Sequence, residues 1–148
     1  MMNKVFIDTD IILDLLAKRD PFYYHSASLF SLIESGKLRG FVSSLIFSNF
    51  YYILKKHNTR KDTIEILKKL KVMITVLPVD DKIIDRALLS DFNDFEDAIQ
   101  YYTAKTNNID YIITRNIKDY KSSDIKALSA DQLLNILNNT KNGAVHFK

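Results

Sequence analysis

The chain has 148 residues, of which 47% are hydrophobic and 26% are charged, and its formal net charge is +3. This length and composition are ordinary for one globular domain with a proper core. The absence of cysteine excludes disulfides, thiolate metal sites and cysteine nucleophiles, and it fits a reducing cytoplasm. No apolar stretch approaches the roughly 20 residues of a membrane span, so we expect a cytoplasmic protein without a membrane partner.

Histidine and glycine are scarce, which limits the kinds of site available. The three histidines, at positions 25, 57 and 146, have no ligand spacing. Any metal would therefore be bound by oxygen atoms, which favours Mg²⁺ or Mn²⁺ over zinc. The three glycines form neither a phosphate-binding loop nor a dinucleotide fingerprint, which argues against conventional nucleotide binding.

Strand and helix patterns alternate along the whole chain. The hydrophobic runs predict strands at 5–7, 38–42, 73–77 and 111–114. The periodic segments predict helices at 11–18, 23–35, 46–54, 59–70, 80–89, 94–106 and 129–137. Repeated strand–helix units indicate an α/β three-layer sandwich, in which a central parallel sheet is flanked by helices. We expect one domain over residues 1–137 and a flexible C-terminal tail over 138–148.

Two carboxylates, Asp8 and Asp10, directly follow the first predicted strand. The carboxyl ends of strands in open parallel sheets are where ligands bind. Acidic groups delivered there need a compensating charge, most simply a divalent cation. One aspartate could instead cap the next helix, but a second is more than a cap needs. This segment therefore favours a metal site.

A second acidic cluster, Asp94, Glu96 and Asp97, begins the helix predicted at 94–106. Asp94 as N-cap and Asp97 at the third helical position resemble a capping box, which the helix dipole favours. Three acids within four residues also repel one another unless a cation lies between them. Capping and metal binding are both open interpretations of this cluster.

A third polar group follows the strand predicted at 111–114. Thr114, Arg115 and Asn116 lie at the strand end, and Asp119 comes three residues later. In a parallel sheet this strand end lies at the same edge as Asp8. Three separate segments therefore bring acids or amides toward one edge of the sheet, which helix capping does not require.

Charges of opposite sign are segregated along the chain. Residues 55–71 carry seven basic side chains, beginning with Lys55 and Lys56, whereas residues 80–97 carry seven acidic ones. A basic surface beside an acidic pocket suits a metal-dependent enzyme that acts on a nucleic acid. Lysine-rich helix faces are, however, usually only solvated surface.

Together these motifs resemble the PIN-domain ribonucleases, from residue 6 to about 137. The segments that carry the resemblance are 6–10, 43–45, 51–54, 94–98 and 111–116. The first and third acids of that family correspond to Asp8 and Asp97. Its fourth acidic position falls on Asn116, with Asp119 as the available substitute, and its second falls on Asn49.

The resemblance implies an acidic pocket that holds one or two Mg²⁺ or Mn²⁺ ions and hydrolyses phosphodiester bonds in single-stranded RNA. Asp8 and Asp97 would be direct ligands, whereas Asp94, Glu96 and Asp119 would hold metal-bound water or orient the ligands. Asp10 could compensate for the missing carboxylates. Ser43 and Thr114 could hydrogen-bond the carboxylates or a phosphate oxygen. Arg115, together with Lys55 and Lys56, would contact the phosphates of the RNA.

Many members of this family are VapC-like toxins, so the resemblance also implies a cognate antitoxin protein as a partner. Family members often form two-fold dimers, and the chain has more aromatic and apolar residues on its early helices than one small core can hold. We therefore expect a homodimer. The residues that suggest it are Phe22, Tyr23, Tyr24, Leu29, Phe30, Tyr51 and Tyr52.

Two other functions remain open at this point. Asn49 and Asn116, where the family usually has acids, would suit a degenerate PIN domain that binds RNA or a protein without cutting. The segment from Phe6 to Asp10 also fits the Asp-x-Asp opening of haloacid-dehalogenase-like phosphatases, with Asp8 as covalent nucleophile. Against the phosphatase, the chain is short and the acids at 94–97 would have no role.

Overall fold

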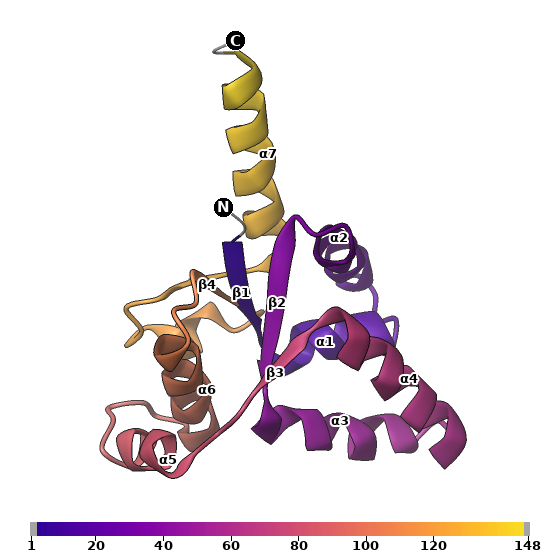
Figure 1. Cartoon of the computed structure of the whole chain (residues 1–148), viewed down its shortest axis with the longest axis vertical. Helices are drawn as coiled ribbons and strands as arrows, with labels where there is room; N and C mark the ends of the chain where they lie inside the picture. The colour runs from indigo at the N-terminus through magenta and orange to yellow at the C-terminus, as the bar shows by residue number, and fades with distance from the viewer. Residues whose placement is uncertain (1–2, 147–148) are drawn as a thin grey trace.

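The structure is a computed structural model that describes residues 3–146 (Figure 1). Its strands are β1 (Asn3–Ile7), β2 (Leu38–Ser43), β3 (Thr75–Leu77), β4 (Tyr111–Ile113) and β5 (Lys126–Leu128). Its helices are α1 (Thr9–Leu16), α2 (Tyr23–Glu34), α3 (Ser44–Lys55), α4 (Arg60–Met73), α5 (Asp81–Leu88), α6 (Phe95–Thr106), the short 3-10 helix η1 (Ile117–Tyr120) and α7 (Ala130–His146).

The five strands form one parallel sheet in the order β3-β2-β1-β4-β5, which confirms the predicted fold class. Strand β1 lies in the centre, where Phe6 is paired with Phe41 of β2 and with Ile112 of β4. A strand with neighbours on both sides and helices on both faces is buried, and this accounts for the apolar residues Val5, Phe6 and Ile7, which are fully buried in the second half of β1.

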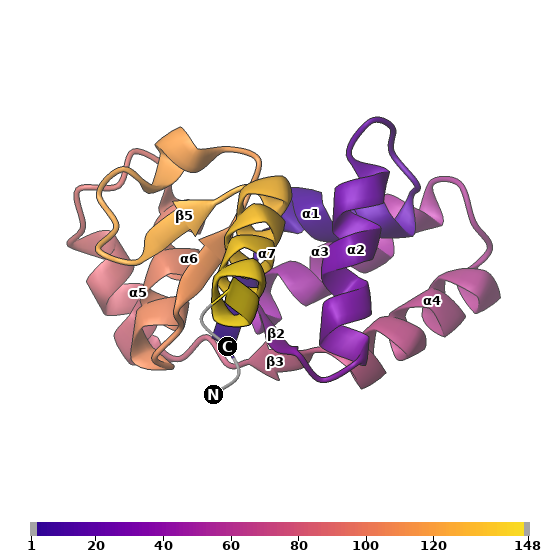
Figure 2. The same cartoon turned by 90° about the horizontal axis from the view of Figure 1, so that it is seen from above.

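Alternate residues of β1 supply two separate hydrophobic layers. Val5 and Ile7 pack in the larger core, to which α1, α2, α3, α4 and α7 contribute. Phe6 points to the other face, where it packs with residues of α6 and η1. Figure 2 shows α5 and α6 on one side of the sheet and α1 to α4 on the other. The three layers of the predicted sandwich are thus two helical layers and the sheet between them.

The order of the strands creates a switch point between β1 and β4. From β1 the chain continues to β2 and β3 on one side of the sheet, and α5 and α6 then carry it to β4 on the other side. In open parallel sheets the crevice outside the strand ends at such a point is where ligands bind. Asp8 follows β1 and Thr114 follows β4, so both lie at this crevice.

The structure differs from the sequence prediction mainly near the C-terminus. Strand β5 and helix η1, which are only three and four residues long, were not predicted. Helix α7 was expected to end at residue 137 but runs from Ala130 to His146. The backbone at 138–146 is therefore helical, and residues 147–148 of the expected tail lie outside the described residues. The flexibility of this segment stays a prediction.

The side chains that suggested a dimer are divided between the core and the surface. Leu29 and Phe30 are buried in the larger core, so they are not available to a dimer interface. Tyr24 and Tyr52 are 72% and 70% exposed. Among residues 3–146, no helix is both long and apolar enough to cross a membrane.

Candidate active site

Asp8 lies at the C-terminal end of β1 and is fixed there by two hydrogen bonds. Its Oδ1 accepts from the backbone nitrogen of Thr9 at 2.9 Å, which makes Asp8 the N-cap of α1. Its Oδ2 accepts from Thr114 Oγ1 at 2.8 Å, which confirms the expected bond from Thr114 to a carboxylate. Burial raises the pKa of Asp8, although both hydrogen bonds oppose this effect. Asp8 therefore caps α1 with one carboxylate oxygen, and Thr114 fixes the position of the other oxygen.

Asp97, on the first turn of α6, has the most perturbed carboxyl group at this edge. Burial raises its pKa from 3.8 to about 7, and the charges of Asp94, Asp8, Asp119 and Glu96 add to the effect. A carboxyl group with this pKa is half-protonated near neutral pH, which means that its neighbours disfavour its charge. Carboxylates forced together in this way, at a switch point, are typical of functional sites.

The five acids Asp8, Asp94, Glu96, Asp97 and Asp119, here called the acidic edge, come from three separate segments. Asp94 is the N-cap of α6 and accepts from the backbone nitrogen of Asp97 at 3.0 Å, as the capping interpretation predicted. Burial, Asp94 and Asp8 all raise the pKa of Glu96. A cavity of about 210 Å³ is lined by Asp94, Asp97 and Asp119 together. This cavity is the opening of the acidic edge to solvent.

The donor set of the acidic edge suits a hard cation such as Mg²⁺ or Mn²⁺. Carboxylate oxygens are the protein ligands these ions prefer, and a cation would relieve the repulsion that raises the pKa of Asp97. Within the described part of the chain, no three histidine, aspartate or glutamate side chains are arranged to hold an ion directly. Mg²⁺ usually keeps several waters and binds through only one or two carboxylates, so Asp8 and Asp97 fit that mode.

Tyr120 and two lysines join the acidic edge, and the sequence reasoning missed their roles. The hydroxyl of Tyr120 is buried and finds no hydrogen-bond partner within residues 3–139. Burial and the charges of the acidic edge raise its pKa. Lys118 and Lys121 line the same cavity as Asp97. Their position beside Asp119, in a segment that follows the end of a strand, could have indicated that they lie at this site.

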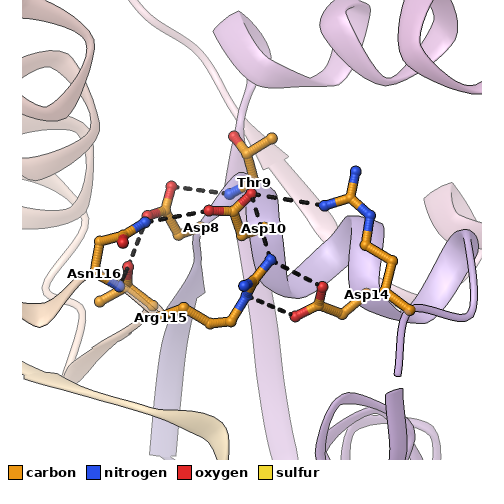
Figure 3. A network of polar contacts seen from close by, with 8 residues as sticks. Asp8, Thr9, Asp10, Asp14, Arg115 and Asn116 are labelled. Atoms are coloured by element: carbon orange, nitrogen blue, oxygen red, sulfur yellow. Dashed lines mark hydrogen bonds and ion pairs between the residues drawn. The ribbon is translucent and has the colours of Figure 1, made fainter. Parts of the chain in front are cut away.

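Asp10 lies in a network of polar contacts that also contains Asp8 (Figure 3), and its charge adds to the effects that raise the pKa of Asp8. Its Oδ2 accepts from Asn116 Nδ2 at 3.2 Å, and its Oδ1 lies 3.9 Å from both Arg19 Nη1 and Arg115 Nη2. Asp10 is thus already compensated by neighbouring donors and cations. Its expected role as a substitute ligand stays a prediction.

Arg115 is anchored to a buried carboxylate that the sequence analysis did not single out. Its Nη2 donates to Asp14 Oδ1 at 3.2 Å, and its Nε lies 3.0 Å from Asp14 Oδ2 (Figure 3). Asp14 is fully buried, and burial raises its pKa, against the effect of Arg115. Because this ion pair orients the guanidinium, Arg115 is not a free phosphate ligand in this structure.

The remaining predicted site residues lie at different distances from the acidic edge. The hydroxyl of Ser43 donates to Gln100 Oε1 at 2.5 Å rather than to a carboxylate. Gln100 lies about one helical turn after Asp97 on α6. Asn49 lies part-buried on α3. Lys55 and Lys56 lie at the far end of α3, roughly 16 Å along the helix from Ser44. A direct role for either lysine would therefore need a long RNA.

Comparison with known proteins identifies the family of this chain. A family model described as PIN domain matches residues 4–118. This range covers the strands from Lys4 of β1 to β4 and four of the five acids of the acidic edge, the exception being Asp119. The chain belongs to the PIN domain family. The predicted resemblance is thereby confirmed, and the phosphatase alternative is no longer needed.

Individual relatives of this PIN domain are distant in sequence but match nearly its whole length. Ribonuclease VapC1 of Aquifex aeolicus (strain VF5) is 26% identical over 135 residues, covering 88% of this chain and 92% of the relative. VapBC from Salmonella typhimurium bound to DNA has a TM-score of 0.66 at 16% identity, covering 87% of this chain and 99% of that one. A toxin–antitoxin complex from Klebsiella pneumoniae has a TM-score of 0.65 at 19% identity, covering 85% and 97%. At such identities the structural likeness shows the fold.

Proposed function

We propose that this PIN domain is a metal-dependent endoribonuclease that hydrolyses phosphodiester bonds in single-stranded RNA. The observation that carries the proposal is the pair Asp8 and Asp97 at the switch point, where repulsion and burial raise the pKa of Asp97 to about 7. A divalent cation bound at this edge would relieve the repulsion between the acids. Cations bound by carboxylates in this way promote the hydrolysis of phosphodiester bonds. The name of the Aquifex relative, a ribonuclease, supports the same reaction.

In this proposal, some residues of the chain would bind the metal ion and others would orient its ligands or the RNA. Asp8 and Asp97 would hold Mg²⁺ or Mn²⁺, and Asp94, Glu96 and Asp119 would accept hydrogen bonds from its water molecules. The bound ion would supply a water molecule of lowered pKa as the nucleophile. Thr114 fixes the orientation of Asp8 through its 2.8 Å bond, as outer partners of metal ligands do. Lys118 and Lys121, in the wall of the cavity, would attract the phosphates.

We further propose that the protein is the toxin of a toxin–antitoxin pair and acts in the cytoplasm. The titles of its structural neighbours name VapBC and toxin–antitoxin complexes. A small protein encoded in the neighbouring reading frame, copurifying with this chain and suppressing its activity, would be the cognate antitoxin.

Cleavage of single-stranded RNA in the presence of Mn²⁺ tests the nuclease proposal. Asp8→Asn should abolish cleavage because it removes a charge from the metal site, and it should keep the fold because an amide oxygen can still accept the bond from Thr114. Asp62→Asn, a change of the same kind on the exposed start of α4, is the matched control and should retain full activity. Equal activity in the parent and Asp8→Asn would refute the proposal.

The second candidate is a PIN domain that binds RNA or a protein without cutting. Its support comes from Asn49 and Asn116, which stand where the family usually has acids. Calorimetry with Mn²⁺ separates the two candidates. A nuclease should bind the ion, and Asp97→Asn should abolish binding. A purely binding module should show no heat of Mn²⁺ binding in either the parent or the variant.

A further inference from the structure

A pocket of about 270 Å³ lies next to the acidic edge, between α1, α2, the start of α7 and the loop after β4. We call it the side pocket, and its lining includes Phe22, His25, Ser26, Arg115, Asn116 and Asp131. It connects to Asp8 through short steps. The backbone nitrogen of Asn116 donates to Thr114 Oγ1 at 3.0 Å, and this hydroxyl donates to Asp8 at 2.8 Å.

One wall of the side pocket is a stacked aromatic and cationic surface. The guanidinium carbon of Arg115 lies 4.0 Å from the centre of the Phe22 ring. Asp14 holds the guanidinium in this position from within the core. Phe22 is 40% exposed, so part of its ring remains open to a ligand. Aromatic rings and guanidinium planes are the surfaces on which unpaired nucleic-acid bases stack.

The side pocket also contains a polar group without a partner. Ser26 is 1% exposed, and its hydroxyl forms no hydrogen bond to any residue in the described part of the chain. A buried hydroxyl is unfavourable unless a ligand or water pairs with it. Asn116 and Asp131 add an amide and a carboxylate to the same lining. The lining thus offers hydrogen bonds as well as a stacking surface.

The charges in the side pocket favour a neutral ligand over an anion. Arg115 is paired with the buried Asp14, and Asp131 adds a further negative charge beside His25. A phosphate group would meet no unpaired arginine or lysine here. The volume is slightly below the roughly 300 Å³ at which pockets for drug-sized molecules begin, which suits a smaller planar group.

We propose that the side pocket binds one unpaired nucleobase of single-stranded RNA, from a nucleotide next to the phosphate that is cleaved at the acidic edge. The proposal rests on the nuclease function proposed above and extends it to substrate selection. Phe22 supplies the stacking surface, and Ser26 reads the polar edge of the base with Asn116 and Asp131. Ser26 is therefore a specificity-determining residue, whereas Arg115 keeps the stacking surface in position.

Binding to RNAs that lack single bases tests this proposal. The probe is a short, fluorescein-labelled single-stranded RNA together with a set of versions that each lack one base, measured by anisotropy in EDTA so that no cleavage occurs. For the parent protein, loss of one particular base should weaken binding about 5- to 150-fold, the range measured for base–aromatic stacking. Loss of the other bases should have smaller effects.

The variant Phe22→Ala should bind the intact RNA as weakly as the parent binds the sensitive abasic RNA, and it should lose that sensitivity. Phe22→Tyr, which keeps the ring, should restore both. Ser26→Ala should retain the sensitive position but change which of the four bases is preferred there. Thermal melts of each variant show whether the fold is kept, independently of RNA binding. Because Phe22 is partly exposed, its truncation should leave the fold intact.

A flat abasic profile in the parent, or an unchanged profile in Phe22→Ala, would overturn the base pocket. These results are distinguishable from failure of the nuclease proposal. A protein that cleaves RNA but shows a flat profile keeps the nuclease function and loses the base pocket. A protein that shows the coupled loss between one base and Phe22 but cleaves nothing keeps the base pocket and loses the nuclease function.

Discussion

Asp97→Asn should stabilise the metal-free protein at high pH and have little effect at low pH. The pKa of Asp97 is raised in the folded state from 3.8 to about 7, first by burial and then by Asp94, Asp8 and the other acids. An acid whose pKa is raised by folding contributes stability below its unfolded pKa, and that stability is lost as the pH rises through the folded value. Asparagine has the shape of aspartate but no charge, so the variant avoids this loss.

The size of the effect follows from the shift. Roughly three pKa units at 1.36 kcal/mol each set an upper limit of about 4 kcal/mol. Asp97 is partly exposed, so water and salt reduce this value, and we expect about 2 kcal/mol at pH 8. For a domain of this size, that gain corresponds to an increase in Tm of about 4–8 °C. The gain should develop between about pH 4 and pH 7 and be complete by pH 8.

Thermal melts of the parent and the variant in EDTA, across pH 5 to 8, measure this difference. The matched control is Asp124→Asn, because hydrogen bonds from Lys105 and Tyr101 lower the pKa of Asp124 in the folded state. Asp124 therefore contributes stability at neutral pH that disappears as the pH falls, and its removal should destabilise the protein at pH 8. An effect of Asp97→Asn that is the same at pH 5 and pH 8, or a loss of stability at pH 8, would refute the reasoning.

Three further predictions concern the metal site and assembly. Thr114→Val should weaken Mn²⁺ binding and RNA cleavage about 10- to 100-fold because it removes the bond to Asp8, and Thr114→Ser should restore both in calorimetry and cleavage assays. Asn49→Glu should increase the rise in Tm caused by Mn²⁺ if position 49 lines the site, and an unchanged rise would exclude it. The exposed Tyr24 and Tyr52 still favour a homodimer, which a stable monomer in light scattering at high micromolar concentration would contradict.

The fold could be predicted from the sequence because its signals are local. The apolar run of β1 is buried on both faces, and the helices begin where capping residues such as Asp80 and Asp94 predict. Strand β5 was missed, whereas β3, which is equally short, was predicted, because β3 lies in a run rich in β-branched residues and the segment Lys126–Leu128 contains no β-branched or aromatic residue. Its pairing with β4, which no local signal reveals, is what makes it a strand.

The candidate site was only partly predictable because several of its contacts join residues far apart in the chain. The position of Asp8 at a strand end predicted its location, since parallel strands share one edge. The partner of Arg115 was expected to be an RNA phosphate, but it is Asp14, which is 101 residues away in sequence. Asp14 looked like an ordinary polar residue of an amphipathic helix, and only tertiary packing against Arg115 explains why a carboxylate is buried there.

The amide at position 116 is better explained by Asp10 than by the loss of a catalytic acid. Asn116 Nδ2 donates to Asp10, and an ionised carboxylate at that position could not donate. An aspartate there would also add a negative charge beside Asp10. The guanidinium groups of Arg19 and Arg115 lie 3.9 Å from Asp10 Oδ1, so they would compensate this added charge only weakly. Asp119, three residues further on, adds a negative charge that raises the pKa of both Asp8 and Asp97. We propose that Asp119 takes the place of the fourth family acid, which would leave Asn49 as the family position without a carboxylate and would favour a working nuclease over a degenerate one.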